Sequence, residues 1–189
     1  MNVLKKPRKK RPLTILPTQQ LVQQVWDYVL ARPKKKGEQK KELLECVFLL
    51  CWKVGLRVSE AIAFNLSLVH PEPEYKNLYL LRGKGSKDRW VYLSEEIRQE
   101  LKKRNWKPHR VHRVSFFDFL NQLKKELRIP ARTELAPHTL RRCFATYNTL
   151  AGMPLNILQR ILGHSKISTT ALYIKDSDLS NLVKFRPIA

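Results

Sequence analysis

Four short segments of this chain carry residue types that can act on a phosphate group. Two of them hold an arginine, Arg57 in GLRVSE and Arg141 in HTLR. The third holds a lysine between two glycines, Lys84, and the fourth joins a histidine, His164, to a tyrosine nine residues later, Tyr173. Guanidinium groups are planar, always protonated and able to bind two phosphate oxygens at once. A tyrosine hydroxyl, once it is activated, can serve as a nucleophile.

Taken one at a time, these residues have plain structural explanations. A lone arginine such as Arg57 commonly pairs with a nearby acid, here Glu60, and a lysine in a glycine-rich turn is usually solvated. His138 and Arg141 are three residues apart and share a helix face, as many surface pairs do. A tyrosine near an apolar helix end, such as Tyr173, is more often part of a core. A chemical interpretation therefore depends on the whole set.

The spacing of apolar residues predicts a mainly helical domain with one small β-element. Thr18 is a suitable N-cap for a first helix with apolar residues over 21–30, and Gly55 is a suitable end for a second, mostly buried helix. Alternation over 77–93 predicts an antiparallel hairpin with a glycine-rich tip.

Further helices are expected to position the remaining segments. Pro154 is expected in the first turn of one of them and Ser168 as the N-cap of the last. The expected ranges are 59–64, 94–104, 115–127, 137–151, 154–162 and 168–175.

The charge balance points to a polyanionic partner. The 189 residues include 37 Lys and Arg against 16 Asp and Glu, a formal net charge of +21. Self-repulsion of this size is best tolerated next to nucleic acid, although a basic solvated or ribosome-associated surface would look the same. Residues 1–12 are expected to be a flexible basic arm that either contacts phosphates or solubilises the chain, and residues 13–189 to be one domain.

The cysteines and the hydropathy pattern bear on the compartment. Cys46, Cys51 and Cys143 show no metal-ligand spacing, and the first two are expected to be small buried apolar residues. An odd number of cysteines without a secretory leader suggests a reducing compartment. There is no run of 18 apolar residues and so no expected membrane span. We expect a cytoplasmic protein associated with the DNA of the nucleoid.

The joint pattern resembles the tyrosine recombinase, or phage integrase, family along nearly the whole chain from about Leu13. The stretch from His138 to Tyr173 is similar to the family's paired boxes almost without a gap: H-x-x-R, a helix, L-G-H and then T-T-x-x-Y. The resemblance implies the catalytic-domain fold of that family, mainly α with a small antiparallel β-sheet (α+β). It also implies cleavage and rejoining of DNA without ATP, through a tyrosine that expels a 5′-hydroxyl and leaves a 3′-phosphotyrosyl link.

Two arginines form the phosphate clamp that the resemblance implies. Arg57 and Arg141 would stabilise the negative charge that the non-bridging oxygens gain in the transition state, so neither a metal nor another cofactor is expected. Lys87 and Arg89 in the hairpin are expected to contact backbone phosphates of the DNA. The full set of expected catalytic residues is Arg57, Lys84, His138, Arg141, His164 and Tyr173.

The other roles also come from the resemblance. Lys84 would protonate the leaving oxygen, His138 would act as the base for Tyr173, and His164 would hydrogen-bond the phosphate. Glu60 matches an acidic residue of the first box. It is expected either to orient a neighbour in the site or to cap its own helix.

The chain departs from the family in length. Full-length relatives carry an N-terminal core-binding domain that closes a clamp around DNA, whereas here only about twelve basic residues precede the first helix. We therefore expect either a fragment or a minimal enzyme that relies on its arm or on an accessory DNA-binding partner. The tail over 174–189 would pack on a neighbouring copy or fold back. The expected partners are double-stranded DNA and further copies of the chain, as a tetramer on DNA during synapsis.

Two other functions share some of these features. A type IB topoisomerase uses the same chemistry but relaxes DNA without partners, and an inactive regulator would keep the fold and bind DNA alone. The small size and the G-L-R-x-S-E and L-G-H boxes favour a site-specific recombinase or integrase over the topoisomerase. An intact set of six chemical residues argues against the inactive regulator.

Overall fold

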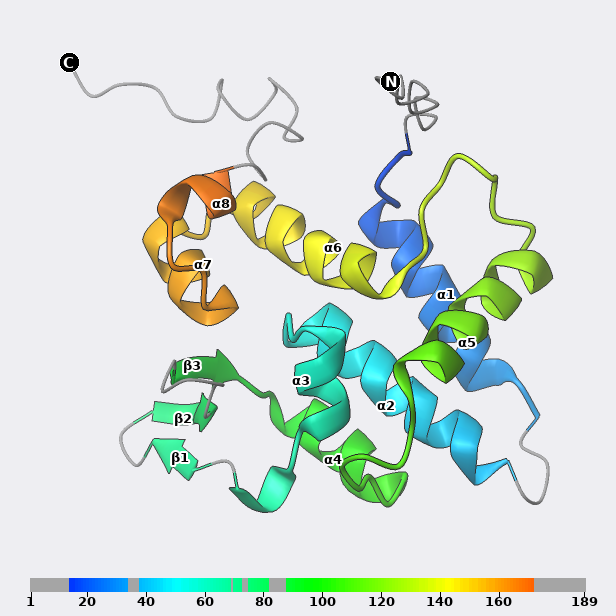
Figure 1. Ribbon diagram of the computed structural model, residues 1–189, viewed down its shortest axis with the longest axis horizontal. Helices are drawn as coiled ribbons and strands as arrows, with labels where there is room; N and C mark the ends of the chain where they lie inside the picture. Colours follow the sequence, from blue (N-terminus) through cyan, green and yellow to red (C-terminus); the bar gives the residue numbers. More distant parts are fainter. Residues whose placement is uncertain (1–13, 34–37, 69, 73–74, 82–87, 172–189) are drawn as a thin grey trace, which may run out of the picture.

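Helix α2 (Gln39–Lys53) runs through the centre of the protein, and packed against it are α3 (Val58–Ala63), α4 (Glu95–Lys103), α5 (Arg113–Glu126) and α6 (Pro137–Leu150) (Figure 1). All ten of its residues from Leu43 to Trp52 are buried. A helix that is buried around its whole circumference has to be covered by other elements on every side. This helix therefore holds together the rest of the domain.

The computed structural model describes residues 14–33, 38–68, 70–72, 75–81 and 88–171. It is a mainly helical body with one small antiparallel sheet at its side, which confirms the predicted fold class (Figure 1). The other elements are α1 (Gln19–Ala31), a 3-10 turn (Leu66–Leu68), β1 (His70–Glu72), β2 (Tyr75–Leu81), β3 (Arg89–Tyr92), α7 (Leu155–Leu162) and α8 (Ile167–Ala171).

Two of the predicted helix boundaries are confirmed by their local geometry. The Thr18 hydroxyl caps α1 by accepting a hydrogen bond from the backbone N–H of Leu21 at 3.2 Å. Gly55 follows the end of α2 with a φ of +73°. A Cβ at this position would lie 2.5 Å from the Phe144 ring of α6, so both the backbone and the packing require glycine.

Two other boundary predictions were wrong in detail. Helix α7 begins at Leu155, and Pro154 is its N-cap in an extended conformation rather than a residue of its first turn. Helix α8 begins at Ile167, so Ser168 lies inside the helix and does not cap it. Residues 172–175 of the predicted last helix, the arm at 1–12 and the tail at 174–189 lie outside the described residues, and the division at residue 13 stays a prediction.

The sheet has one strand more than the predicted hairpin. Its order is β1-β2-β3, with both pairs antiparallel, and in the second pair Leu81 lies opposite Arg89. Strand β1 was missed because it is three residues long and contains Pro71. Proline has no backbone N–H to donate to a neighbouring strand, so its presence usually indicates a turn. An edge strand such as β1 can nevertheless contain it. Within β3, Arg89 and Val91 are buried and the residues that alternate with them are exposed.

All three cysteines are buried and free, as predicted for Cys46 and Cys51. In the part of the chain that the structure describes, no helix has the length and apolar character that crossing a membrane requires.

A buried ion pair links α2 to the end of α4. Glu45 of α2 is 5% exposed and Arg104 is 2% exposed. The Arg104 Nε donates to Glu45 Oε2 at 2.9 Å, and the Arg32 Nη2 reaches Glu45 Oε1 at 3.5 Å. The Arg104 Nη1 also pairs with Glu100, which is more exposed than Glu45. Removing Glu45 would leave the buried Arg104 with this one partner and with less compensation of its charge.

The substitution Glu45→Gln is therefore expected to lower the free energy of unfolding by about 3 kcal/mol, which is the lower end of the range seen when a buried ion pair is broken. Glu134→Gln makes the same chemical change in a half-exposed pair with Arg142 and should cost less than about 1 kcal/mol. Urea unfolding of the two variants beside the wild type measures both values. Equal losses in the two variants would contradict the structural role given to Glu45.

Candidate active site

The carboxylate of Glu60 lies at the start of α3 and is shared by arginines from several elements. Its Oε2 accepts the backbone N–H of Arg57 at 2.8 Å, and its Oε1 accepts the Arg57 Nη1 at 2.9 Å. The sequence left open whether Glu60 caps its helix or orients a neighbour. It does both, because the backbone bond caps α3 and the side-chain bond holds the Arg57 guanidinium.

Arg89 of β3 meets the same carboxylate from the other side. Its Nη1 donates to Glu60 Oε1 at 3.0 Å and its Nη2 to Oε2 at 2.7 Å, a two-pronged pair. Its Nε donates to the backbone carbonyl of Ile161 at the end of α7, at 2.9 Å. Arg89 is only 7% exposed. The prediction that it contacts DNA phosphates is wrong, because its guanidinium points inward and is already bound on three sides.

Arg141 of α6 is buried and held by backbone carbonyls. Its Nη1 donates to the Gly55 carbonyl at 2.7 Å and its Nη2 to the Leu162 carbonyl at 2.6 Å. These two carbonyls lie just after the end of α2 and at the end of α7, where a helix leaves carbonyls without intrahelical partners. The Arg141 Nη1 is also 3.7 Å from Glu60 Oε2.

His164 completes the group. Its Nε2 lies 3.3 Å from the Arg141 Nη2, and its Nδ1 lies 3.0 Å from the Thr170 hydroxyl of α8. A guanidinium can only donate, so Nε2 must accept and the ring proton sits on Nδ1. Burial lowers the pKa of His164, and the positive charges of the three nearby arginines lower it further, from 6.5 to about 4. The ring is therefore neutral at neutral pH.

The glycine of the L-G-H box, Gly163, is required by both its backbone conformation and its packing. The residue ends α7 in the left-handed conformation with a φ of +64°. A Cβ there would lie 2.8 Å from the Arg89 Cδ. Only glycine therefore lets the turn before His164 close against Arg89.

The electrostatics of the site favour an anion. Three guanidiniums, those of Arg57, Arg89 and Arg141, surround the single carboxylate of Glu60. Partial burial raises the pKa of Glu60, but hydrogen bonds and charge from Arg89 and hydrogen bonds from Arg57 outweigh it and lower the pKa from 4.5 to about 2. The acid stays ionised and the cluster keeps an excess of positive charge, which suits a phosphate group.

The structure brings together three of the six predicted catalytic residues. Arg57 and Arg141 lie beside Glu60, and His164 joins the group through Arg141, although Arg57 is 84 residues before Arg141 in the sequence. His138 is exposed on the first turn of α6, and none of the hydrogen bonds given above for the cluster involves it. Lys84 and Tyr173 lie outside the described residues. Thr170, which contacts His164, precedes Tyr173 by three residues.

The sequence analysis named Arg89 only as a contact to DNA phosphates and Thr170 only as part of the T-T-x-x-Y box, and it predicted neither as a member of this cluster. The signal for Arg89 was present in the strand alternation, because Arg89, Val91 and Leu93 fall on the side that the hydrophobic pattern marks as buried. Thr170 lies in the T-T-x-x-Y box, but nothing local indicates that its hydroxyl reaches a histidine six residues earlier.

A shallow groove of about 560 Å³ adjoins the cluster. It is lined by Arg89 and His164 and by the exposed Trp90 and Arg160. The groove lies between β3 and the end of α7, and besides Arg89 its lining carries one further arginine and one acid, Asp88. In the part of the chain described, no group of three or more His, Cys, Asp or Glu side chains could hold a metal ion.

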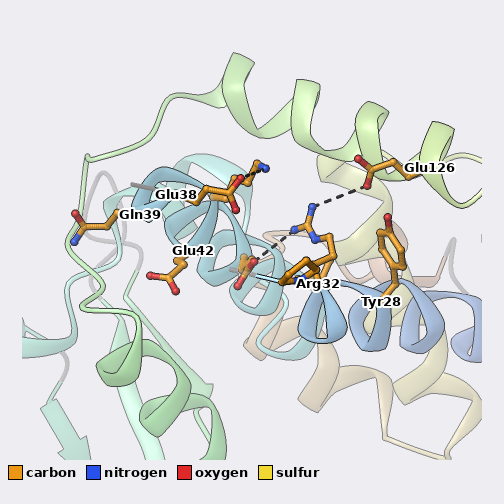
Figure 2. Close-up of a pocket in the computed structure, with 10 residues that line it drawn as sticks. Tyr28, Arg32, Glu38, Gln39, Glu42 and Glu126 are labelled. Atoms are coloured by element: carbon orange, nitrogen blue, oxygen red, sulfur yellow. Dashed lines mark hydrogen bonds and ion pairs between the residues drawn. The ribbon is translucent and has the colours of Figure 1, made fainter. Parts of the chain in front are cut away.

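A second pocket, of about 430 Å³, has the opposite character (Figure 2). Its lining includes Glu38, Glu42 and Glu126, with Arg32 between Glu45 and Glu126 at 3.5 and 4.0 Å (Figure 2). The acids of α2 that line it, Glu42 and Glu45, are in the first half of that helix, whereas the arginine cluster follows its last residue, roughly 12–17 Å further along the helix axis. A pocket rich in carboxylates repels phosphate, so we place the anion site at the arginine cluster.

Comparison with known proteins identifies the family of the chain. The profile of the phage integrase family matches residues 19–179. The chain belongs to this family. Tyrosine recombinase XerD of Brucella suis is 31% identical over 193 residues, which cover 90% of this chain and 62% of the relative. XerD of Oceanobacillus iheyensis is 32% identical over 187 residues, covering 88% and 59%. The chain thus spans about three fifths of the length of these relatives.

Solved structures share the integrase fold. XerH site-specific recombinase, in a post-cleavage complex with a palindromic difH substrate, superposes with a TM-score of 0.72 at 17% identity, covering 91% of this chain and 52% of XerH. The catalytic domain of bacteriophage HP1 integrase superposes with a TM-score of 0.55 at 25% identity, covering 82% of this chain and 95% of that domain. The family resemblance predicted from the sequence is therefore confirmed.

The low pKa of Glu60 predicts how the stability of this integrase domain depends on pH. Because folding lowers that pKa from 4.5 to about 2, the carboxylate stabilises the fold above pH 4.5, and this stabilisation disappears as the pH falls toward 2. The unfolding free energy of the wild type minus that of Glu60→Gln should shrink by about 3 kcal/mol between pH 5 and pH 2. Denaturant titrations at the two pH values measure it, and a constant difference would exclude Glu60 as the ionised centre.

Proposed function

We propose that this chain cleaves and rejoins double-stranded DNA as the catalytic part of a site-specific recombinase or integrase, with Tyr173 as the nucleophile. The observation that carries the proposal is the cluster of Arg57, Arg141 and His164 around Glu60, which has the charge and the donors that a scissile phosphate needs. Membership of the phage integrase family supports the same reaction.

The first step is binding of the scissile phosphate by the two clamp arginines. Arg141 is fixed by two carbonyls, so little rearrangement is needed before it meets an oxygen. The Arg57 side chain is 39% exposed and reaches the phosphate from the solvent side. Preorganised donors of this kind typically contribute about 3–4 kcal/mol each to the transition state.

His164 acts on a non-bridging oxygen. In the DNA-free protein its Nε2 accepts from Arg141, so it cannot donate to the phosphate until a proton occupies that nitrogen. The negative charge of a bound phosphate raises the pKa of the ring and favours that proton. Thr170 holds the other nitrogen, so the ring keeps its orientation while its protonation changes.

The covalent step transfers the phosphoryl group to Tyr173. Its hydroxyl attacks the phosphorus as His138 accepts the phenolic proton, and the 5′-oxygen leaves as Lys84 protonates it. The phosphotyrosyl bond keeps the bond energy, and a free 5′-hydroxyl from another strand can later reverse the reaction. Further copies of the chain, assembled as a tetramer on DNA, and an accessory DNA-binding partner would supply the synapsis.

The identity of the nucleophile can be tested by trapping the covalent intermediate. The probe is a pool of nicked duplexes with random sequence around the nick, because the cleaved fragment then diffuses away and the protein–DNA adduct accumulates. The wild type and Tyr92→Phe, a change at an exposed tyrosine of β3, should give an adduct that survives denaturation. Tyr173→Phe should give none, and an adduct in that variant would disprove the assignment.

The role of Lys84 can be tested with a better leaving group. A 5′-bridging phosphorothioate, placed in the duplex recovered from the adduct pool, leaves as a thiolate and needs little protonation. It should restore cleavage to Lys84→Ala but not to Arg57→Ala, since the arginine acts on the non-bridging oxygens. Single-turnover adduct formation measures both rates. Failure of the sulfur substrate to rescue Lys84→Ala would show that another group is the acid.

A further inference from the structure

We propose that Arg89 is a positioning residue of this active site, which holds the Glu60 carboxylate and the end of α7 in register and so keeps Arg57, Arg141 and His164 in place for the phosphate. The inference rests on the proposed function above, because it concerns the same site. Arg89 does not touch the phosphate in this proposal. It acts through Glu60 and through the backbone before His164.

The contacts of Arg89 join three elements. From β3, the guanidinium binds both oxygens of Glu60 in α3, at 3.0 and 2.7 Å, and the Ile161 carbonyl in α7, at 2.9 Å. All three of its nitrogens are thus engaged in different directions. A lysine offers one nitrogen and could not make this set of bonds from one position.

The carboxylate has a competing partner that Arg89 restrains. Glu60 Oε2 lies 2.7 Å from the Arg89 Nη2 but 3.7 Å from the Arg141 Nη1. Without Arg89, Oε1 would keep the Arg57 guanidinium but Oε2 would keep only the backbone N–H of Arg57, so Oε2 would be drawn toward the Arg141 guanidinium. Arg141 would then be neutralised and pulled from its two carbonyls. Arg89 therefore holds the Glu60 carboxylate away from the Arg141 guanidinium.

The L-G-H turn is built around the same side chain. At Gly163 the absence of a Cβ admits the Arg89 Cδ, which would otherwise lie 2.8 Å from that atom. Arg89 binds the carbonyl of Ile161, and Arg141 binds the carbonyl of the next residue, Leu162. Two guanidiniums therefore fix successive carbonyls of the turn that presents His164, so displacement of Arg89 displaces the ring.

The experiment compares Arg89→Lys and Arg89→Met with Arg98→Lys. Arg98 also binds a carboxylate, that of Glu95, and a neutral side chain, the Tyr79 hydroxyl, but lies in α4. The readout is the first-order rate of adduct formation at saturating concentrations of the nicked duplex recovered above. Both Arg89 variants should be slower by about 100-fold, the effect typical of misplacing reacting groups by an ångström. Arg98→Lys should keep the wild-type rate, and DNA affinity should be retained in all three.

A double-mutant cycle separates positioning from independent action. If Arg89 acts through Glu60, then Arg89→Met should slow the Glu60→Gln protein far less than it slows the wild type. Additive losses would overturn the proposal, as would an unchanged rate in both Arg89 variants. Loss of the folded state in both variants, seen by circular dichroism, would also overturn it, because Arg89 would then be required for folding rather than for placement.

A second readout does not depend on activity. Nitrogen NMR of the His164 imidazole should show the proton on Nδ1 in the wild type and a mixture with the Nε2 form in Arg89→Lys, as the turn loosens. The same wild-type spectrum in the variant would contradict the positioning role. A wild-type protein that forms no adduct would instead contradict the proposed function, and the imidazole spectra would still decide the role of Arg89.

Discussion

The ion pairs of the Glu60 carboxylate are the interaction on which the rest of the site depends. Arg57, the N-cap of α3, and Arg89 of β3 bind it directly, and the Nη1 of Arg141 in α6 lies 3.7 Å from it. A single acid thus compensates part of the charge of three guanidiniums while leaving an excess for a phosphate. Because two of those guanidiniums are buried, their positions cannot change without exposing an uncompensated charge to the protein interior. The carboxylate therefore sets the geometry of the clamp.

Backbone carbonyls supply the rest of the support. Helices α2 and α7 are both followed by glycines with positive φ, and the carbonyls around these helix ends bind Arg141 and Arg89. Such carbonyls carry partial negative charge from the helix dipole, so they attract a guanidinium without cancelling its full charge. Binding by carboxylates alone would hold the arginines as firmly but would neutralise them. The design keeps the arginines rigid and still cationic.

Much of this organisation could be predicted from local sequence. Apolar spacing gave the helices, Thr18 and Gly55 marked two boundaries, and the boxes around Arg57, Arg141 and His164 indicated the family before any geometry was known. The errors in secondary structure concerned one short strand and two helix ends. Strand β1 was missed because Pro71 is typical of a turn. Pro154 precedes the first residue of α7, and α8 begins one residue before Ser168, because helix ends are less sharply defined by sequence than helix centres.

The sequence by itself determined which residue types are available to the site, in what order and at what spacing. The tertiary structure decided that Arg89 binds both oxygens of the Glu60 carboxylate and that Arg141 is held by backbone carbonyls. Arg89 and Glu60 are 29 residues apart, and Arg141 and Gly55 are 86 residues apart. The periodicity of a sequence carries information only about residues within the same helix or strand. It therefore cannot tell which of several arginines is buried or which group each arginine binds. Their roles diverge through burial and pairing, which exist only once the distant elements have packed together.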